Sequence, residues 1–134
     1  MPIVNDASIP DDAILLRVLH PSSLWRCRVG GRYRPTSLAF QDGLTGDVSC
    51  FVQAEGVEAQ VRQMYPHNEI ATVTAGAVRA AGYVIERRPG ECGNFTGDPN
   101  AHVVIGPPEP ITKKAQTRRA RRIAEHDATT ILPD

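Results

Sequence analysis

The chain has 134 residues, about the length of one domain, and its formal net charge is zero. Only 5% of the residues are aromatic, so the core has to be built from aliphatic side chains, while eleven glycines and eleven prolines favour many short elements. No apolar run approaches the roughly 18 residues that a membrane span needs, and the first residues lack the basic and then apolar order of a signal peptide. We therefore expect a protein of a bacterial-type cytoplasm that makes no membrane contact.

The composition divides the chain into four parts. Residues 1–10 are polar and contain two prolines, which predicts a flexible lead-in. Residues 11–106 carry alternating apolar segments and turn residues, as expected of a single α+β domain. Residues 107–110 contain three prolines and predict a stiff spacer, and residues 111–134 predict a basic C-terminal helix or tail.

Short apolar runs predict the strands of the domain. The first run ends at His20-Pro21, because proline cannot donate a hydrogen bond to a strand ladder. The pair Gly30-Gly31 lies between alternating residues and predicts a β-hairpin. We expect strands at residues 13–19, 48–52 and 101–105, the hairpin within residues 24–40, a turn at residues 41–47 and a long irregular loop at residues 87–100.

Residues 69–86 predict a strand, a two-turn helix and a second strand. Thr74 can cap the start of the helix, and Gly82 can end it in the left-handed conformation. The connection between these strands is nine residues, shorter than the dozen or so that a parallel crossover usually takes. With an amphipathic helix at residues 56–65, the fold class is α+β: a small mixed or antiparallel twisted sheet, two short helices and a C-terminal basic helix.

The zero net charge hides a segregation of charge along the chain. Residues 1–112 contain nine arginines, no lysine and twelve acids, whereas residues 113–134 contain six cations and three acids. A helix over residues 111–128, capped by Thr112, has no large apolar residue before Ile123, so we expect it to fray or to be ordered by a partner. Its charge density suits nucleic-acid phosphates, and the alternative is a solvated tail or one that contacts the acidic body. The candidate anion-binding residues are Lys113, Lys114, Arg118, Arg119, Arg121 and Arg122.

Four further arginines flank the predicted hairpin turn. Arg26 and Arg28 precede it, and Arg32 and Arg34 follow it, so the hairpin would bring the four together on one ribbon. Four guanidinium groups repel one another unless an anion lies among them, which makes the ribbon a second candidate surface for a polyanion. The alternative is that these arginines pair with acids of the body.

The histidines and cysteines lack the spacing of a metal site. There is no Cys-x-x-Cys or His-x-x-x-His pair, so we assign no metal ligand, and no nucleotide-binding fingerprint or other sign of a cofactor is present. Cys27, Cys50 and Cys92 are odd in number and widely spaced, which favours reduced thiols. His102 follows the long loop; it could act as an acid or a base if it faced a cleft, or it could be a partly exposed strand residue.

The segment Leu15-Leu16-Arg17-Val18-Leu19-His20, followed by a strand that carries Ser49, resembles the opening of small ADP-ribosyltransferase-like toxins. The resemblance covers less than half of the chain. It implies that an early strand presents arginine or histidine to NAD and that a later strand supplies a glutamate, for which Glu86 and Glu91 are candidates. It therefore implies that Arg17, His20, Ser49 and one glutamate meet in a pocket.

Three functions follow as hypotheses. The first is a non-enzymatic binding or accessory protein that contacts a polyanion, such as nucleic acid, or a protein partner through the arginine ribbon and the basic helix. The second is a small NAD-using transferase or toxin, with Arg17, His20, Ser49 and His102 as candidate catalytic residues. The third is a structural subunit that assembles through its C-terminal helix.

Overall fold

A computed structural model describes residues 3–41, 47–89 and 97–133, and in it six strands form one antiparallel sheet. The strand order is β6-β7-β4-β1-β5-β8, and all neighbouring strands run antiparallel. The predicted α+β class is thereby confirmed. The strands are β1 (Ile14–Val18), β4 (Val48–Val52), β5 (Ile70–Thr74), β6 (Val84–Arg87), β7 (His102–Gly106) and β8 (Thr130–Ile131).

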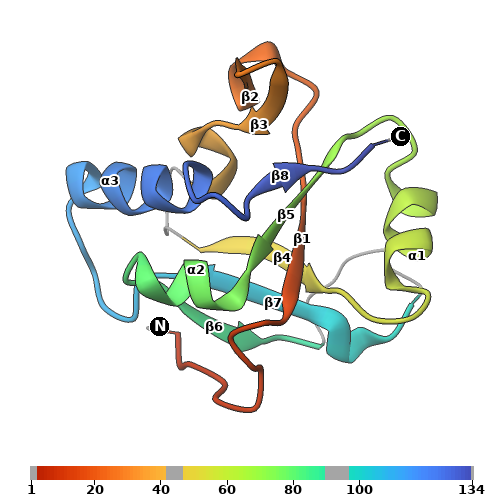
Figure 1. The fold of residues 1–134 in the computed structure, drawn as a ribbon. Helices are drawn as coiled ribbons and strands as arrows, with labels where there is room; N and C mark the ends of the chain where they lie inside the picture. The colour runs from red at the N-terminus through yellow and green to blue at the C-terminus, as the bar shows by residue number, and fades with distance from the viewer. Residues whose placement is uncertain (1–2, 42–46, 90–96, 134) are drawn as a thin grey trace.

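Helices and a separate hairpin surround this sheet (Figure 1). The predicted hairpin forms, and none of the helices in the described ranges is long and apolar enough to cross a membrane. The middle of the expected turn, residues 42–46, and of the expected loop, residues 90–96, lies outside the described residues. The remaining elements are the hairpin strands β2 (Arg26–Val29) and β3 (Arg32–Pro35), the helices α1 (Val57–Met64), α2 (Ala75–Ala80) and α3 (Lys113–Ala124), and the 3-10 turns η1 (Ser23–Trp25), η2 (Ser37–Phe40) and η3 (Pro99–Ala101).

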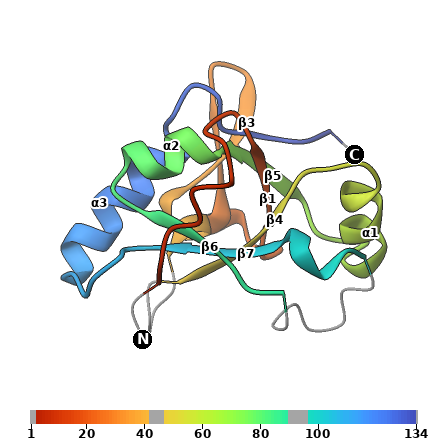
Figure 2. The same ribbon diagram turned by 90° about the horizontal axis from the view of Figure 1, so that it is seen from below.

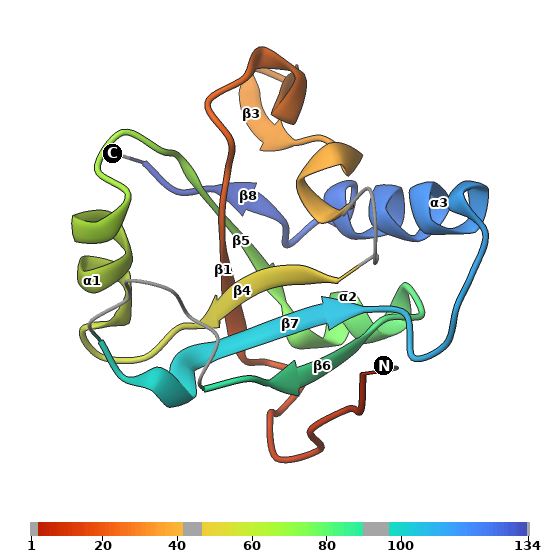
Figure 3. The same cartoon turned by 180° about the vertical axis from the view of Figure 1, so that it is seen from behind.

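The sheet is strongly twisted, so β1 and β5 cross β4, β7 and β6 at a steep angle (Figures 1 and 3). The predicted strand, helix and second strand form as β5, α2 and β6. In the sheet, however, β7, β4 and β1 lie between β5 and β6. Twist brings the end of β5 towards the start of β6, and this explains how the short α2 segment connects two strands that are not neighbours.

The two faces of the sheet bury separate apolar clusters. Leu15 and Leu16 are both buried but belong to different clusters, because successive strand residues point to opposite faces. The Leu15 face packs against Val78 of α2 and Ile123 of α3. The Leu16 face packs against Val61 of α1, and Figure 2 shows α1 on the side of the sheet opposite to α2 and α3.

Both predicted helix caps form. The Thr74 hydroxyl accepts a hydrogen bond from the Ala77 amide at 3.1 Å, and the Thr112 hydroxyl accepts one from the Ala115 amide at 3.1 Å. Gly82, just after α2, has a φ of 95°, which is the left-handed region that glycine enters without strain. These positions were readable from sequence because a cap depends on residues only two or three positions away.

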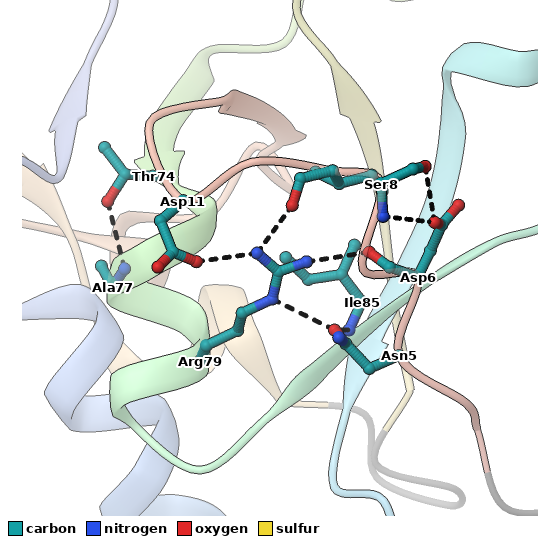
Figure 4. Close-up of polar contacts among 9 residues, drawn as sticks. Asn5, Asp6, Ser8, Asp11, Thr74, Ala77, Arg79 and Ile85 are labelled. Carbon is teal, nitrogen blue, oxygen red and sulfur yellow. Dashed lines mark hydrogen bonds and ion pairs between the residues drawn. The ribbon is translucent and has the colours of Figure 1, made fainter.

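The N-terminal segment differs from the flexible lead-in that the sequence predicts for residues 1–10. Ile3 and Ile9 are buried in the domain, and the Asp6 amide donates to the Ile85 carbonyl at 2.7 Å. The guanidinium group of Arg79, on α2, holds this segment in place (Figure 4). It donates to the side chains of Asn5 and Asp11 and to the carbonyls of Asp6 and Ile9, at 2.7 to 3.1 Å.

The C-terminal helix also differs from expectation. Ala120, Ile123 and Ala124 are buried, and α3 packs beside η2 rather than fraying. Alanine side chains are small enough to let the helix backbone approach the core closely, so a sequence without large apolar residues still has a packing face. After α3, the short strand β8, which the sequence analysis missed, pairs Ile131 with Ala71 of β5.

Replacing Arg79 with alanine tests the attachment of the N-terminal segment. We expect a loss of about 2 kcal/mol in the free energy of unfolding, because partly buried carbonyls of the segment lose charged donors. Urea unfolding measures this loss, and limited proteolysis should cut residues 3–12 sooner than in the wild type. Arg32→Ala, at an exposed hairpin residue, is the matched control; equal stability of the two variants would contradict the assignment.

Glu86 gives the fold a pH dependence. Hydrogen bonds from the Arg88 side chain and the Val4 amide lower the pKa of Glu86 below its ordinary value of 4.5. Its carboxylate therefore stabilises the fold above about pH 4.5, and this contribution disappears as the pH falls through the lowered folded-state pKa. We expect the free energy of unfolding of Glu86→Gln to vary less steeply below pH 4.5 than that of the wild type or of Glu55→Gln, at an exposed position; parallel curves would refute this.

Candidate functional site

The strands β1 and β4 separate soon after they pair. Their ladder contains only the pairs Leu15↔Val52 and Leu16↔Phe51, whereas β1 pairs with β5 along its whole length. Where the ladder ends, the guanidinium group of Arg17 lies between the strands. Its Nε donates to the Ala39 carbonyl at 2.7 Å and its Nη1 to the Ser49 carbonyl at 3.2 Å, so a side chain joins β4 to β1.

The separation of these strands leaves a pocket of about 230 Å³, which we call the β1–β4 pocket. Its aromatic wall includes Trp25, whose ring centroid lies 5.2 Å from the Arg17 guanidinium carbon and 5.8 Å from the His20 ring. The positive charge of Arg17 thus lies against an aromatic face, an arrangement that holds the guanidinium in one orientation. Among its lining residues are Arg17, His20, Trp25, Ser49, Tyr65 and Asn68.

Ser49 and His102 form a hydrogen-bonded pair at the β1–β4 pocket. The Ser49 hydroxyl lies 2.6 Å from Nε2 of His102, and Nδ1 of the same ring lies 2.8 Å from the carbonyl oxygen of Arg88. His102 is only 2% exposed, whereas Ser49 is exposed. The structure therefore excludes the partly exposed strand residue that the sequence offered as one reading of His102.

The structure brings together most of the residues singled out by the resemblance to ADP-ribosyltransferase-like toxins. Arg17, His20 and Ser49 line one pocket, but no glutamate is among the lining residues in the described part of the chain. Glu86 is engaged by Arg88 and by the Val4 amide instead, and Glu91 lies outside the described residues. Tyr65 and Asn68 carry no signal in the sequence that places them at this pocket, because they approach it from a distant segment after α1.

Of the two cysteines in the described ranges, Cys50 is poorly suited to act as a nucleophile. Cys50 is fully buried, and burial raises the pKa of its thiol to about 11, so it stays protonated and a poor nucleophile near neutral pH. Cys27 is partly buried on the hairpin strand β2, and Cys92 lies outside the described residues. Within the described ranges, no group of three or more His, Cys, Asp and Glu residues could hold a metal ion.

The arginine ribbon forms, but its four arginines do not share one face. The hairpin register pairs Arg28 with Tyr33 and Val29 with Arg32, so Arg26 and Arg28 lie on the face opposite to Arg32 and Arg34. Arg26 makes an ion pair with Glu69 at 3.0 Å and lies 4.5 Å from the Tyr33 ring centroid. The Arg28 guanidinium also faces this ring, at 5.9 Å. The two-residue turn at Gly30-Gly31 sets this register, and the expectation of one shared surface did not take account of the alternation of side chains along each strand.

The cations of α3 divide by helix face. Arg119 lies next to the buried face and donates to the Gly82 carbonyl at 2.8 Å. Lys113 is exposed at the first turn of α3. The exposed residues Lys114, Arg118, Arg121 and Arg122 recur at i, i+4, i+7 and i+8, and we call them the α3 basic face. Within the described ranges, no carboxylate lies within ion-pair distance of these four side chains.

The α3 basic face continues towards the hairpin. Arg121 and Arg34 line the same hollow of about 210 Å³, together with Ser37 and Glu125. On its other side, Arg121 lines a hollow of about 330 Å³ with Lys114 and Arg118. Figure 3 shows η2 between the hairpin and α3. Folding therefore places cations from two distant segments of the sequence at one surface.

Comparisons with protein-family models, curated proteins and solved structures gave no match to this chain. The α3 basic face and the β1–β4 pocket are therefore the features of the structure that bear on function.

Arg17 can be tested by substitution. Arg17→Met should lower the free energy of unfolding by about 3 kcal/mol, because two carbonyls lose charged donors, and Arg17→Lys should recover only part of this, since an ammonium group lacks the fork of a guanidinium. Trp25, the single tryptophan, reports unfolding by fluorescence in urea. If Arg17→Met were as stable as the wild type, Arg17 would not be what joins the two strands.

Proposed function

We propose that this protein binds nucleic acid through the α3 basic face, in a cytoplasm of bacterial type. The supporting observation is that four exposed cations share one face of a helix whose opposite face is anchored in the core. A rigidly held row of charge loses little conformational entropy on binding, unlike a disordered basic tail. The helix presents charge and no aromatic side chain, which suits phosphate contacts rather than base stacking.

The contrast with five arginines of the body supports this assignment. Arg26, Arg62, Arg79, Arg87 and Arg88 all make ion pairs with acids of the body. These pairs neutralise much of the charge that could otherwise attract an anion. The α3 basic face has no such pairs in the described part of the chain, so its charge is available to a ligand.

The dimensions of the α3 basic face set the expected number of contacts. At 1.5 Å per residue, the span from Lys114 to Arg122 is about 12 Å. One strand of a duplex carries a phosphate about every 3.4 Å along the axis, so this face can meet about three phosphates. Arg34, across the hollow that it shares with Arg121, is placed to add one more contact. Binding should be moderate in affinity, strongly dependent on salt and largely independent of sequence.

The double variant Arg118→Gln/Arg121→Gln tests this function. Fluorescence anisotropy with a labelled 20-base-pair duplex, measured between 50 and 300 mM NaCl, should show weaker binding and a slope of log K against log salt that is smaller by about two. The matched control is Arg26→Gln/Arg62→Gln, which removes two arginines that already pair with carboxylates. Its salt slope should stay within about half a unit of the wild type.

Two results would overturn the proposal. One is an equal loss of binding in both double variants, which would mean that only overall charge matters. The other is competition by poly-glutamate that is as strong as competition by unlabelled duplex, which would point to an acidic protein partner instead.

A further inference from the structure

The β1–β4 pocket lies apart from the α3 basic face, and the nucleic-acid proposal makes no use of it. We propose that this pocket is a hydrolytic site for small carboxylic esters, in which Ser49 is the nucleophile and His102 is the general base. The proposal stands on the Ser49, His102 and Arg88 geometry and does not depend on nucleic-acid binding.

The hydrogen bonds of His102 determine its tautomer. A backbone carbonyl can only accept, so Nδ1, at 2.8 Å from the Arg88 oxygen, carries the proton. In the neutral ring, Nε2 then presents its lone pair to the Ser49 hydroxyl at 2.6 Å. Ser49 therefore donates to His102. A hydroxyl that donates to an oriented imidazole is the arrangement that activates a serine nucleophile.

The backbone holds this pair rigidly. Ser49 and His102 lie on the adjacent strands β4 and β7, whose register pairs Ser49 with Val104 and Phe51 with His102. The two side chains are therefore diagonal neighbours on one face of the sheet. The Phe51 ring packs edge-on against the imidazole, with the centroids 5.4 Å apart. Groups on paired strands keep their geometry better than groups on loops.

His102 and Ser49 differ in their exposure to solvent. His102 is shielded from water, while the Ser49 hydroxyl lies at the surface and lines the β1–β4 pocket. Here the exposed atom is the one that would attack a substrate, and the protected atom is the one that would take the proton.

The pocket supplies the remaining requirements of an ester hydrolase. Arg17 lines the same pocket and donates to the backbone carbonyl of Ser49, so we assign its positive charge the role of attracting the negative oxygen of a tetrahedral intermediate. The side chains of Trp25 and Tyr65 give the pocket aromatic walls. A volume of about 230 Å³ is enough to hold a short acyl group. We therefore assign a small ester as the substrate class.

The reaction balances without a cofactor. The Ser49 oxygen attacks the ester carbonyl carbon as its proton passes to Nε2 of His102, and the C–O bond to the alcohol breaks as the leaving oxygen takes that proton. Water then gives a proton to His102 and attacks the acyl-serine, and the serine oxygen recovers the proton as the acid leaves. The net change is ester plus water to acid plus alcohol.

Covalent labelling tests the nucleophile directly. The full chain, treated with diisopropyl fluorophosphate, should gain one diisopropylphosphoryl group on the Ser49 oxygen, with fluoride as the leaving group, as shown by intact mass and peptide mapping. Ser49→Ala should gain none. Ser23→Ala, at another exposed serine, is the matched control and should label like the wild type.

Hydrolysis of p-nitrophenyl acetate provides the second readout. Ser49→Ala should lower kcat/KM at least about 100-fold, and His102→Gln should do the same, while Ser23→Ala leaves it unchanged. Since His102 is buried, circular dichroism should be used to check that His102→Gln folds. If that variant does not fold, the labelling and the Ser49→Ala variant still test whether Ser49 is the nucleophile. Labelling that maps away from Ser49, or hydrolysis retained by Ser49→Ala, would overturn the proposal.

Discussion

The early separation of β1 from β4 is the constraint on which the structure of the pocket depends. The sheet is twisted and its strands are short, and the ladder between β1 and β4 contains only the pairs of Leu15 with Val52 and of Leu16 with Phe51. The guanidinium of Arg17, on β1, bonds to the Ser49 carbonyl of β4 and to the Ala39 carbonyl of η2, so a side chain takes the place of the missing ladder. The same event opens a pocket and places a positive charge in it, so Arg17 contributes both to stability and to the site.

The α3 basic face and the β1–β4 pocket differ in which side chains reach the solvent. On α3, alanines at the buried face let the helix lie close to the core, and this leaves its other face to long cationic side chains in water. In the β1–β4 pocket, a buried imidazole is satisfied by Ser49 and by the Arg88 carbonyl, and only the serine reaches the surface. One surface offers charge for a large anion, and the other offers an oriented pair of groups for a small molecule.

Local signals in the sequence predicted most of the elements, and long-range pairing accounts for the rest. The Thr74 cap and the Gly30-Gly31 turn depend on near neighbours, and both occur where they were predicted. The burial of Ile9 and the strand β8 were not predicted, because short or isolated apolar segments gain their stability from distant partners. Ile9 packs in the same cluster as Val78 of α2, and β8 pairs with β5. The four hairpin arginines were expected to act together, but the register of the strands divided them between two faces.

The sequence by itself determined the α+β class, the helix caps at Thr74 and Thr112, the hairpin and the segregation of positive charge towards the C-terminus. These depend on periodicity, on turn residues and on composition, which are properties of the chain before it folds. Only the tertiary structure decided which charges stay unpaired and which side chains meet. Ser49 and His102 are 53 positions apart, and their contact exists because β4 and β7 pair in one register. A shift of one residue in that register would send the two side chains to opposite faces.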